Sequence, residues 1–168
     1  GQDALTSLPT RATLADRLRH ALRRNQRTGG GVSVLFLDLD RFAAINEQHG
    51  HSAGDQLLQR VAARIDDALR PSDTVARFGG DEFVVVCEDV GGTNEALEVA
   101  ERLRVALAPP IAVEDANIVV TASIGVAVAG HTANEADALL QAADRAMYEA
   151  KASGRDSARL ASPGAGWP

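Results

Sequence analysis

The sequence has few of the features that would tie it to an oxidising compartment or to a membrane. It holds one cysteine, Cys87, in 168 residues, so no internal disulfide can form. No stretch approaches the roughly 18 apolar residues of a membrane span, and the N-terminus lacks the apolar core of a signal peptide. Cys87 follows the apolar run 83–86, where we expect a buried thiol. We therefore expect a cytoplasmic domain, or the cytoplasmic part of a larger membrane-attached protein.

Positive charge is also scarce. Asp and Glu number 23 against 17 Lys and Arg, which gives a net charge of −6, and Lys151 is the only lysine. Phosphate contacts along a nucleic acid need surplus positive charge, so the composition excludes nucleic-acid binding by general electrostatics. The length and the 45% of hydrophobic residues suit one soluble globular domain with a sizeable core.

The chain is expected to form one domain, residues 1–160, followed by a linker-like tail. Residues 161–168 read A-S-P-G-A-G-W-P, a composition that is typical of linkers. We therefore expect the chain to be one module of a longer protein, with neighbouring domains.

Apolar periodicity predicts the secondary structure. Apolar residues three or four positions apart mark helices, and short β-branched apolar runs mark strands. The residues 79–82, Gly-Gly-Asp-Glu, separate two such runs and indicate a hairpin, because glycine adopts positive φ readily. The predicted helices are centred on 14–22, 57–69, 96–107 and 139–147, and the predicted strands are 32–37, 74–78, 83–87 and 118–128.

From residue 32 onward the predicted elements follow the order β-α-β-β-α-β, and a last helix comes after them. This is the split βαβ, ferredoxin-like pattern of the α+β class, in which we expect helices on one face of an antiparallel sheet. The same fold plan serves many unrelated activities, so function must be argued from particular residues.

Carboxylates gather where two of the predicted strands end. Asp38 and Asp40 follow the strand 32–37, and Asp81 lies in the hairpin. The first and third strands of a split βαβ sheet are neighbours, so Asp38 and Asp81 should converge. Carboxylates at one edge repel each other unless a cation lies between them, and Mg²⁺ with substrate phosphates suits such a site. The alternative for these residues, and for Asp40 above all, is a solvated turn.

Five motifs, in order and spread over residues 3–156, resemble the GGDEF family of diguanylate cyclases. The hairpin reads R-F-G-G-D-E-F at 77–83, which resembles the family signature. The other motifs are D-A-L-T-S-L-P-T-R at 3–11, D-L-D-R-F-A-A-I-N at 38–46, G-H-S-A-G-D at 50–55 and K-A-S-G-R at 151–155. The resemblance implies a fold similar to the palm of nucleotide cyclases and polymerases, with an antiparallel central sheet flanked by helices.

The resemblance also implies an enzyme that joins two GTP molecules into cyclic di-GMP and releases two pyrophosphates. Each 3′-hydroxyl would attack the α-phosphate of the other nucleotide. Asp38, Asp81 and the carbonyl of Leu39 would hold Mg²⁺, with Mn²⁺ as an alternative. Glu82 would assist deprotonation of the 3′-hydroxyl or help the metal. The catalytic signature carried over to this chain is Gly79, Gly80, Asp81 and Glu82.

A further set of residues is implied to bind GTP. Asn46 and Asp55 match the pair that reads guanine, which suits an amide and a carboxylate facing the polar edge of the base. Phe42 belongs to the same motif as Asn46. Lys151 and Arg155 would contact the triphosphate from one helical face or from its frayed end. Without the resemblance, Asn46 reads as a turn residue, Asp55 as a helix-start residue and the two cations as a solvated helix end.

Another match concerns regulation. Arg70 and Asp73 form an R-x-x-D pair, separated from the glycines by residues 74–78, that resembles the inhibitory site at which the family binds its product. We expect Arg102 to be the second arginine of this site. A guanidinium suits phosphate or guanine contacts, and a carboxylate can accept from guanine. The alternative for the pair is an ordinary helix-ending turn.

The sequence departs from the family pattern at a few positions, of which one bears on the expected triphosphate site. Ala43 replaces a lysine there, and the missing charge would weaken GTP binding or turnover. The other replacements are Ser7 for glycine, Glu47 for aspartate and Asp156 for asparagine.

Ala43 leaves two hypotheses open. The first is an active cyclase, which needs a homodimer because one domain holds one GTP, with cyclic di-GMP as product and inhibitor. The second is a catalytically weak or inactive module that binds GTP or cyclic di-GMP and regulates an attached domain.

Overall fold

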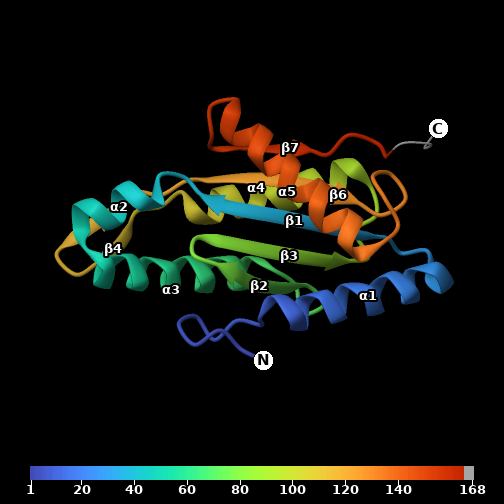
Figure 1. Ribbon diagram of the computed structural model, residues 1–168, viewed down its shortest axis with the longest axis horizontal. Coiled ribbons are helices and arrows are strands. Elements are labelled where there is room, and N and C mark those ends of the chain that lie inside the picture. Colours follow the sequence, from blue (N-terminus) through green and yellow to red (C-terminus); the bar gives the residue numbers. More distant parts are fainter. Residues whose placement is uncertain (165–168) are drawn as a thin grey trace.

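The computed structural model describes residues 1–164, so the last four residues of the expected tail 161–168 lie outside the described part. Its strands are β1 (Val32–Leu39), β2 (Thr74–Gly79), β3 (Glu82–Glu88), β4 (Ile111–Val113), β5 (Ala116–Ile118), β6 (Ala122–Val128) and β7 (Ser157–Leu160). Its helices are α1 (Arg11–Thr28), α2 (Phe42–His49), α3 (His51–Ala68), α4 (Thr93–Leu107) and α5 (Ala136–Ala152). Five strands form the central sheet in the order β2-β3-β1-β6-β7, and β4 and β5 form a separate hairpin (Figure 1).

β1 lies in the middle of the sheet, antiparallel to β3 on one side and to β6 on the other. β2 pairs antiparallel with β3, so four strands follow the predicted ferredoxin-like order. β7 adds a fifth strand parallel to β6, which makes the sheet mixed rather than purely antiparallel. The predicted α+β class and the order of its core elements are confirmed.

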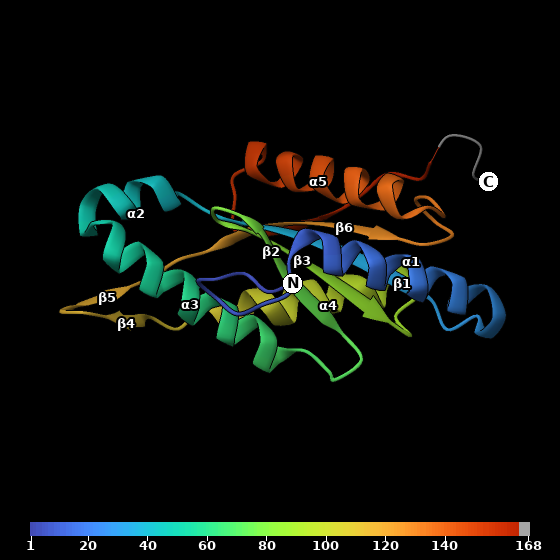
Figure 2. The ribbon, with the colours of Figure 1, turned by 60° about the horizontal axis from the view of Figure 1, so that its bottom comes forward.

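Helices cover both faces of the sheet, so it is flanked by helices as the resemblance implied, and the one-face arrangement expected from the split βαβ pattern is wrong. Side chains of β1 alternate between two buried clusters: Leu35 and Leu37 pack with α3 and α4, whereas Val34 and Phe36 pack with α1 and α5. Figure 2 shows α5 running along β6 on one side of the sheet. Because both faces of β1 are buried, its sequence is a nearly continuous apolar run instead of an alternating one.

The predicted strand 118–128 is wrong in one respect, because it is interrupted. β5 and β6 are separated by residues 119–121, which form no strand. Val119 is 62% exposed, and the Thr121 carbonyl accepts a hydrogen bond from the Asp40 N–H at 2.8 Å. The apolar run therefore contains a connection that binds the end of β1 instead of continuing the ladder.

Besides the β4–β5 hairpin, of which only Ile118 lies in a predicted strand, two elements, α2 and β7, were not predicted. Phe42 is the one buried residue among the eight of α2, so the helix carries no apolar periodicity. β7 has no fully buried residue and follows a glycine that reads as a helix stop. Both elements form because tertiary contacts hold them: α2 packs on α3, and β7 pairs with β6.

α5 lies unusually close to β6. A Cβ added at Gly125 would overlap the Ala143 carbonyl oxygen and the Met147 nitrogen of the helix. Glycine at this point of the strand lets the two backbones approach directly. The contact fixes the position of α5, whose last turn carries Lys151.

The structure bears on two features that are scarce in the sequence, cysteine and long apolar segments. Cys87 is fully buried in β3, and burial raises the pKa of its thiol to about 12, with a smaller contribution from Asp73. Within residues 1–164, none of the helices combines the length and the apolar character that crossing a membrane requires.

Candidate active site

The end of β1 and the hairpin between β2 and β3 meet at one edge of the sheet. This edge is formed by the ends of the strands and not by an outer strand. Asp38 is the register partner of Glu82 in β3. One residue further along β1, the Leu39 N–H donates to the Asp81 carbonyl at 3.2 Å. The structure therefore brings together the three residues that were expected at a metal, Asp38, Leu39 and Asp81.

Only one of the two carboxylate oxygens of Asp38 has a partner in the protein. Lys151 Nζ lies 2.9 Å from its Oδ2 atom, whereas its Oδ1 atom is buried and has no hydrogen-bond partner. Burial raises the pKa of Asp38 to about 7, Asp81 adds to the rise, and Lys151 opposes it. A polar atom buried in this way costs free energy unless a ligand satisfies it.

The atoms at this edge suit a hard divalent cation. Two carboxylates and a main-chain carbonyl are oxygen donors of the kind that Mg²⁺ prefers. A cation would give Asp38 Oδ1 the partner it lacks and would relieve the repulsion between Asp38 and Asp81. In the described part of the chain, no group of three or more His, Cys, Asp or Glu side chains could hold a metal ion. The other ligands of a cation here would be main-chain atoms, water or substrate phosphates.

Glu82 lies among charges of both signs. Burial raises the pKa of Glu82, Asp144 and Asp81 add to the rise, and Arg11 and Lys151 oppose it. Neither Arg11 nor Asp144 was expected at this site from the sequence. Arg11 closes the N-terminal motif, which was the available signal, whereas nothing in the spacing of α5 marked Asp144.

The glycines of the hairpin adopt left-handed or related backbone conformations that favour glycine. Gly79 has φ 145° and Gly80 has φ 44°. No heavy atom lies within 4 Å of the position that a Cβ would take at either residue. Arg77 Nε donates to the Gly80 carbonyl at 3.0 Å and so holds the turn. The hairpin thus presents open main chain next to Asp81.

The two residues expected at guanine lie on adjacent helices. Asn46 is in α2, and the exposed Asp55 is in the first turns of α3. A Cβ at Gly54 would overlap Asn46 Oδ1 and lie 3.4 Å from Phe42 Cζ, so glycine at 54 makes room for both side chains. Asn46 Oδ1 is buried and has no hydrogen-bond partner. An unsatisfied amide oxygen beside an exposed carboxylate can serve a polar ligand.

Lys151 and Arg155 do not share a helical face, although both lie at the C-terminal end of α5. Lys151 is in the last turn of the helix, and Arg155 follows it in a turn where its own φ is 63°. Arg155 Nε is buried and has no hydrogen-bond partner. Of the two arrangements left open by the sequence, the frayed helix end is the closer description.

Asp40 is neither a solvated turn residue nor an open metal ligand. Asp40 is buried, with 4% of its surface exposed. Thr121 Oγ1 donates to Asp40 Oδ2 at 2.6 Å, and Ser123 Oγ donates to Asp40 Oδ1 at 2.7 Å. The Asp156 N–H also donates to Asp40 Oδ2, at 3.0 Å. Both oxygens are therefore committed to protein donors.

The three residues of the expected inhibitory site lie at the other end of β2 from the hairpin glycines. Asp73 Oδ2 accepts from the Arg70 N–H at 2.9 Å, and Arg70 Nη2 donates to the Glu88 carbonyl at 3.1 Å. Asp73 Oδ1 is buried and has no hydrogen-bond partner. Arg102 Nε donates to the Ala68 carbonyl at 3.0 Å. Arg70 and Asp73 therefore already contact each other just after α3, and Arg102 binds the last residue of that helix.

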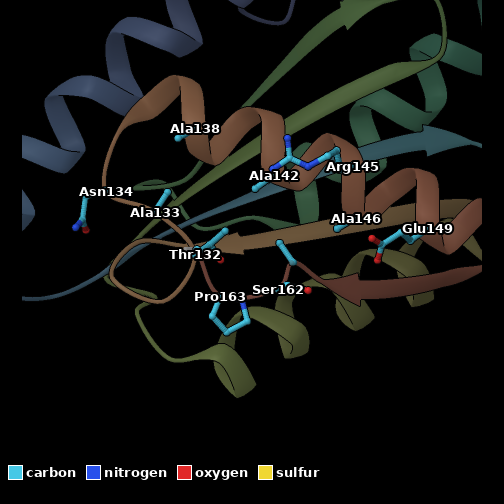
Figure 3. Close-up of a pocket in the computed structure, with 12 residues that line it drawn as sticks. Thr132, Ala133, Asn134, Ala138, Ala142, Arg145, Ala146, Glu149, Ser162 and Pro163 are labelled. Atoms are coloured by element: carbon cyan, nitrogen blue, oxygen red, sulfur yellow. The ribbon is translucent and has the colours of Figure 1, made fainter. Parts of the chain in front are cut away.

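A cleft of about 490 Å³ lies elsewhere, between α5 and residues 161–164 (Figure 3). Its labelled lining includes Thr132, Arg145, Glu149 and Ser162. None of its lining residues in the described part of the chain belongs to the groups discussed above. The candidate active site therefore lies where β1 and the β2–β3 hairpin meet, and not in this cleft.

Comparison with known proteins identifies the family. Residues 1–157 match the family described as "Diguanylate cyclase, GGDEF domain". Diguanylate cyclase TpbB of Pseudomonas aeruginosa is 44% identical over 160 residues, which cover 95% of this chain and 37% of TpbB. The cyclic di-GMP phosphodiesterase NbdA of the same organism is 40% identical over 94% of this chain and 20% of its own length. The chain thus spans well under half of these relatives.

Solved structures agree with the sequence match. The GGDEF domain of TpbB superposes with a TM-score of 0.93 at 42% identity, covering 96% of this chain and 94% of that one. The GGDEF domain of DgcB from Caulobacter crescentus, solved in complex with c-di-GMP, has a TM-score of 0.85 at 27% identity and covers 95% of this chain and 94% of its own. With its signature hairpin beside Asp38 and a match over nearly its full length, the chain belongs to the GGDEF family of diguanylate cyclase domains.

Proposed function

We propose that residues 1–160 form a diguanylate cyclase domain that condenses two GTP molecules into cyclic di-GMP and two pyrophosphates. The observation that carries the proposal is the edge at which Asp38, Leu39 and Asp81 meet, with Lys151 bound to Asp38. In each half-reaction, a 3′-oxygen bonds to the α-phosphorus of the other nucleotide and the bond from that phosphorus to the pyrophosphate oxygen breaks. The proton of the 3′-hydroxyl passes to a base or to water.

Cyclases of this family are generally metal-dependent, and Mg²⁺ is the proposed ion, with Mn²⁺ as the alternative. Asp38, Asp81 and the Leu39 carbonyl would hold it, and it would supply positive charge to the reacting phosphate. Lys151 and Arg155 contribute further positive charge to the triphosphate. Removal of divalent ions with a chelator should abolish turnover, and separate additions of Mg²⁺ and Mn²⁺ should show which ion restores it better.

Glu82 is proposed to accept the proton of the 3′-hydroxyl or to assist the metal. Burial, the largest cause of its raised pKa, makes Glu82 a stronger base than an exposed glutamate. Gly79 and Gly80 leave open space beside the hairpin, so a nucleotide can approach the main chain there.

Guanine recognition is proposed for Asn46 and Asp55. The buried, unpartnered Oδ1 of Asn46 supports this role, because a purine edge would satisfy it. Asp55 can accept from the N1–H and N2–H groups of guanine. Phe42 is buried next to Gly54 and would support the guanine site from the hydrophobic core. Asp55→Ala should raise the KM for GTP while the domain stays folded.

A homodimer is needed for this chemistry, since each domain holds one GTP and the nucleophile of each belongs to the other nucleotide. The two sheet edges must face each other across a pseudo-two-fold arrangement, at least during turnover. Product formation should therefore rise more steeply than linearly with protein concentration until the dimer saturates.

Product inhibition is proposed for Arg70, Asp73 and Arg102. The buried, unpartnered Oδ1 of Asp73 and two arginines nearby offer an acceptor and donors for a guanine and a phosphate. Arg70 must release the Glu88 carbonyl to reach a ligand. Arg70→Ala should raise the concentration of added cyclic di-GMP that halves the rate, and should leave the rate without it unchanged.

A second candidate function rests on Ala43. The alanine leaves the start of α2 without the lysine that the family pattern has there, so triphosphate binding could be too weak for turnover. The domain would then be a binding module for GTP or cyclic di-GMP that regulates an attached domain. NbdA, a phosphodiesterase that contains a similar domain, is consistent with such coupling.

One experiment separates the two functions. The protein is incubated with GTP and Mg²⁺ at high concentration, and the nucleotides are separated by chromatography. Cyclic di-GMP and pyrophosphate in a 1:2 ratio support the cyclase. Calorimetric binding of GTP without any product, at concentrations where the protein is dimeric, supports the binding module.

A further inference from the structure

We propose that Asp40 and Arg104 are positioning residues that hold Arg155 in place for the triphosphate, by fixing the turn that carries it. The inference rests on the proposed function of Arg155. The sequence placed Asp40 among the carboxylates of a metal site or in a solvated turn and gave Arg104 no role, but both contact Asp156, the residue that follows Arg155.

The turn at residues 154–156 has a backbone conformation that is unfavourable on its own. Gly154, Arg155 and Asp156 have φ values of 115°, 63° and 44°, so three consecutive residues lie on the positive side. Residues other than glycine rarely adopt such values, and they keep them only where surrounding contacts compensate the strain. The turn therefore needs external contacts, and they come from two directions.

Asp40 provides the first contact. Its Oδ2 accepts from the Asp156 N–H at 3.0 Å, and hydroxyls of Thr121 and Ser123 bind the same carboxylate at 2.6 and 2.7 Å. The residue is only 4% exposed. A buried carboxylate that two hydroxyls fix in orientation is a rigid acceptor, and a charged acceptor binds an N–H more strongly than a neutral one does.

Arg104 provides the second contact from α4. Its Nη2 donates to Asp156 Oδ1 at 2.9 Å, while its Nη1 donates to Glu101 Oε2 at 2.7 Å. Asparagine, the residue that the family pattern has at 156, could not form this ion pair. The aspartate therefore gives the turn a charged contact of its own in this chain.

The two contacts bear on Arg155 because its side chain leaves from the middle of the turn. The Arg155 N–H is bound to the Ala150 carbonyl at 3.0 Å, and its Nε is buried without a hydrogen-bond partner. The protein therefore leaves this donor of the guanidinium unsatisfied, as it leaves Arg104 Nε. Asp38 binds Lys151 and Asp40 binds Asp156, so the end of β1 contacts both sides of the segment that carries Arg155.

Binding of 3′-deoxy-GTP with Mg²⁺, measured by calorimetry, tests the proposal, since this nucleotide lacks the attacking hydroxyl and cannot react. Asp40→Ala and Arg104→Leu should each lower its affinity by about tenfold, the effect of losing one charged hydrogen bond. Neither should lower the affinity further when Arg155 is already replaced by alanine, because the effect passes through that side chain. In the cyclase assay, the change should fall on the KM for GTP rather than on kcat.

Two control variants sharpen the test. Glu101→Ala removes the other partner of Arg104 but keeps its contact with Asp156, and should bind 3′-deoxy-GTP as the parent does. Asp40→Asn keeps an acceptor for the Asp156 N–H and should recover most of the affinity that alanine loses. If Asp40→Ala does not fold, Asp40→Asn and Arg104→Leu decide.

Either of two binding results would overturn the proposal: parent-like affinity in both Arg104→Leu and Asp40→Ala, or a further tenfold loss when either is combined with Arg155→Ala. Amide hydrogen exchange gives an answer that does not depend on nucleotide, since the Asp156 N–H should exchange faster in Arg104→Leu than in the parent. A parent protein that binds no 3′-deoxy-GTP would contradict the proposed function instead, and unchanged exchange at Asp156 would contradict the inference.

Discussion

Arg77 Nη1 lies 3.2 Å from both carboxylate oxygens of Asp3, a residue 74 positions earlier in the chain. The same guanidinium donates through Nε to the Gly80 carbonyl. Asp3 is itself fixed by the N–H and the hydroxyl of Thr6, at 2.9 and 2.8 Å. The N-terminal motif at 3–11 therefore stabilises the signature hairpin at 77–83 through Arg77. This contact explains why two motifs so far apart in the sequence lie together in the fold.

Asp3→Asn should destabilise the protein and slow turnover together. The amide keeps the shape but loses the charge that binds Arg77, so the free energy of unfolding should fall by about 1–2 kcal/mol in urea titrations. Asp16→Asn is the matched control, because Asp16 pairs with Arg19 on an exposed helix surface and its loss should cost less than about 0.5 kcal/mol. Equal losses in the two variants would contradict the bracing role.

The acid sensitivity of the protein should depend on Asp3. Burial alone would raise the pKa of Asp3, but the hydrogen bonds from Thr6 and the contact with Arg77 outweigh it and lower the pKa below the ordinary value of 3.8. The ionised carboxylate thus stabilises the fold above pH 3.8, and this stabilisation is lost as the pH falls through the lower, folded-state pKa. Unfolding free energies measured between pH 3 and 6 should fall more steeply at the acidic end for the parent than for Asp3→Asn. Parallel curves would refute this.

Gly125→Ala should damage the fold severely. The added methyl would overlap the backbone of α5 at Ala143 and Met147, which cannot move without lifting the helix from β6. We expect a loss of about 3 kcal/mol or failure to fold, seen by thermal unfolding. Gly92→Ala, where the nearest atom is Glu95 Cβ at 3.9 Å, should change stability by less than about 1 kcal/mol. A mild effect at 125 would mean that α5 is free to shift.

Ser7→Gly should stabilise the protein. Ser7 has φ 63°, a left-handed conformation that is costly for serine and free for glycine, the residue that the family pattern has there. A gain of about 0.5–1 kcal/mol is expected in the free energy of unfolding. Ser52→Gly, in the first turn of α3, should have the opposite sign, and stabilisation by both changes would exclude the backbone explanation.

The sequence could predict those parts of the site that follow from strand order. Asp38 lies at the end of β1, and Asp81 lies in the hairpin that leads into β3. The apolar patterns of both strands can be recognised in the sequence, and the split βαβ order makes these strands neighbours, so the two residues converge. The four long helices were predicted for the same reason, since each buries a periodic stripe.

The remaining features depend on contacts that no local pattern encodes. The contacts of Asp40 require hydroxyls from Thr121 and Ser123, which lie at the start of the neighbouring strand β6, and the N–H of Asp156. The position of Arg155 depends on a left-handed turn after α5, whereas its spacing of four from Lys151 suggested a shared helical face. The break at 119–121 is hidden in an apolar run because Val120 is buried although it lies outside any strand.

Asp38 and Asp81 are together proposed to form the site at which GTP is converted to cyclic di-GMP. The most direct test is the initial rate of cyclic di-GMP formation from GTP and Mg²⁺, measured by chromatography for the parent and for Asp81→Asn. Asp81→Asn keeps the size and the turn conformation but removes one carboxylate charge. We expect the parent to form cyclic di-GMP and the folded variant to lose activity by at least about a hundredfold. A parent without product, or a variant that keeps the parental rate, would contradict this proposal.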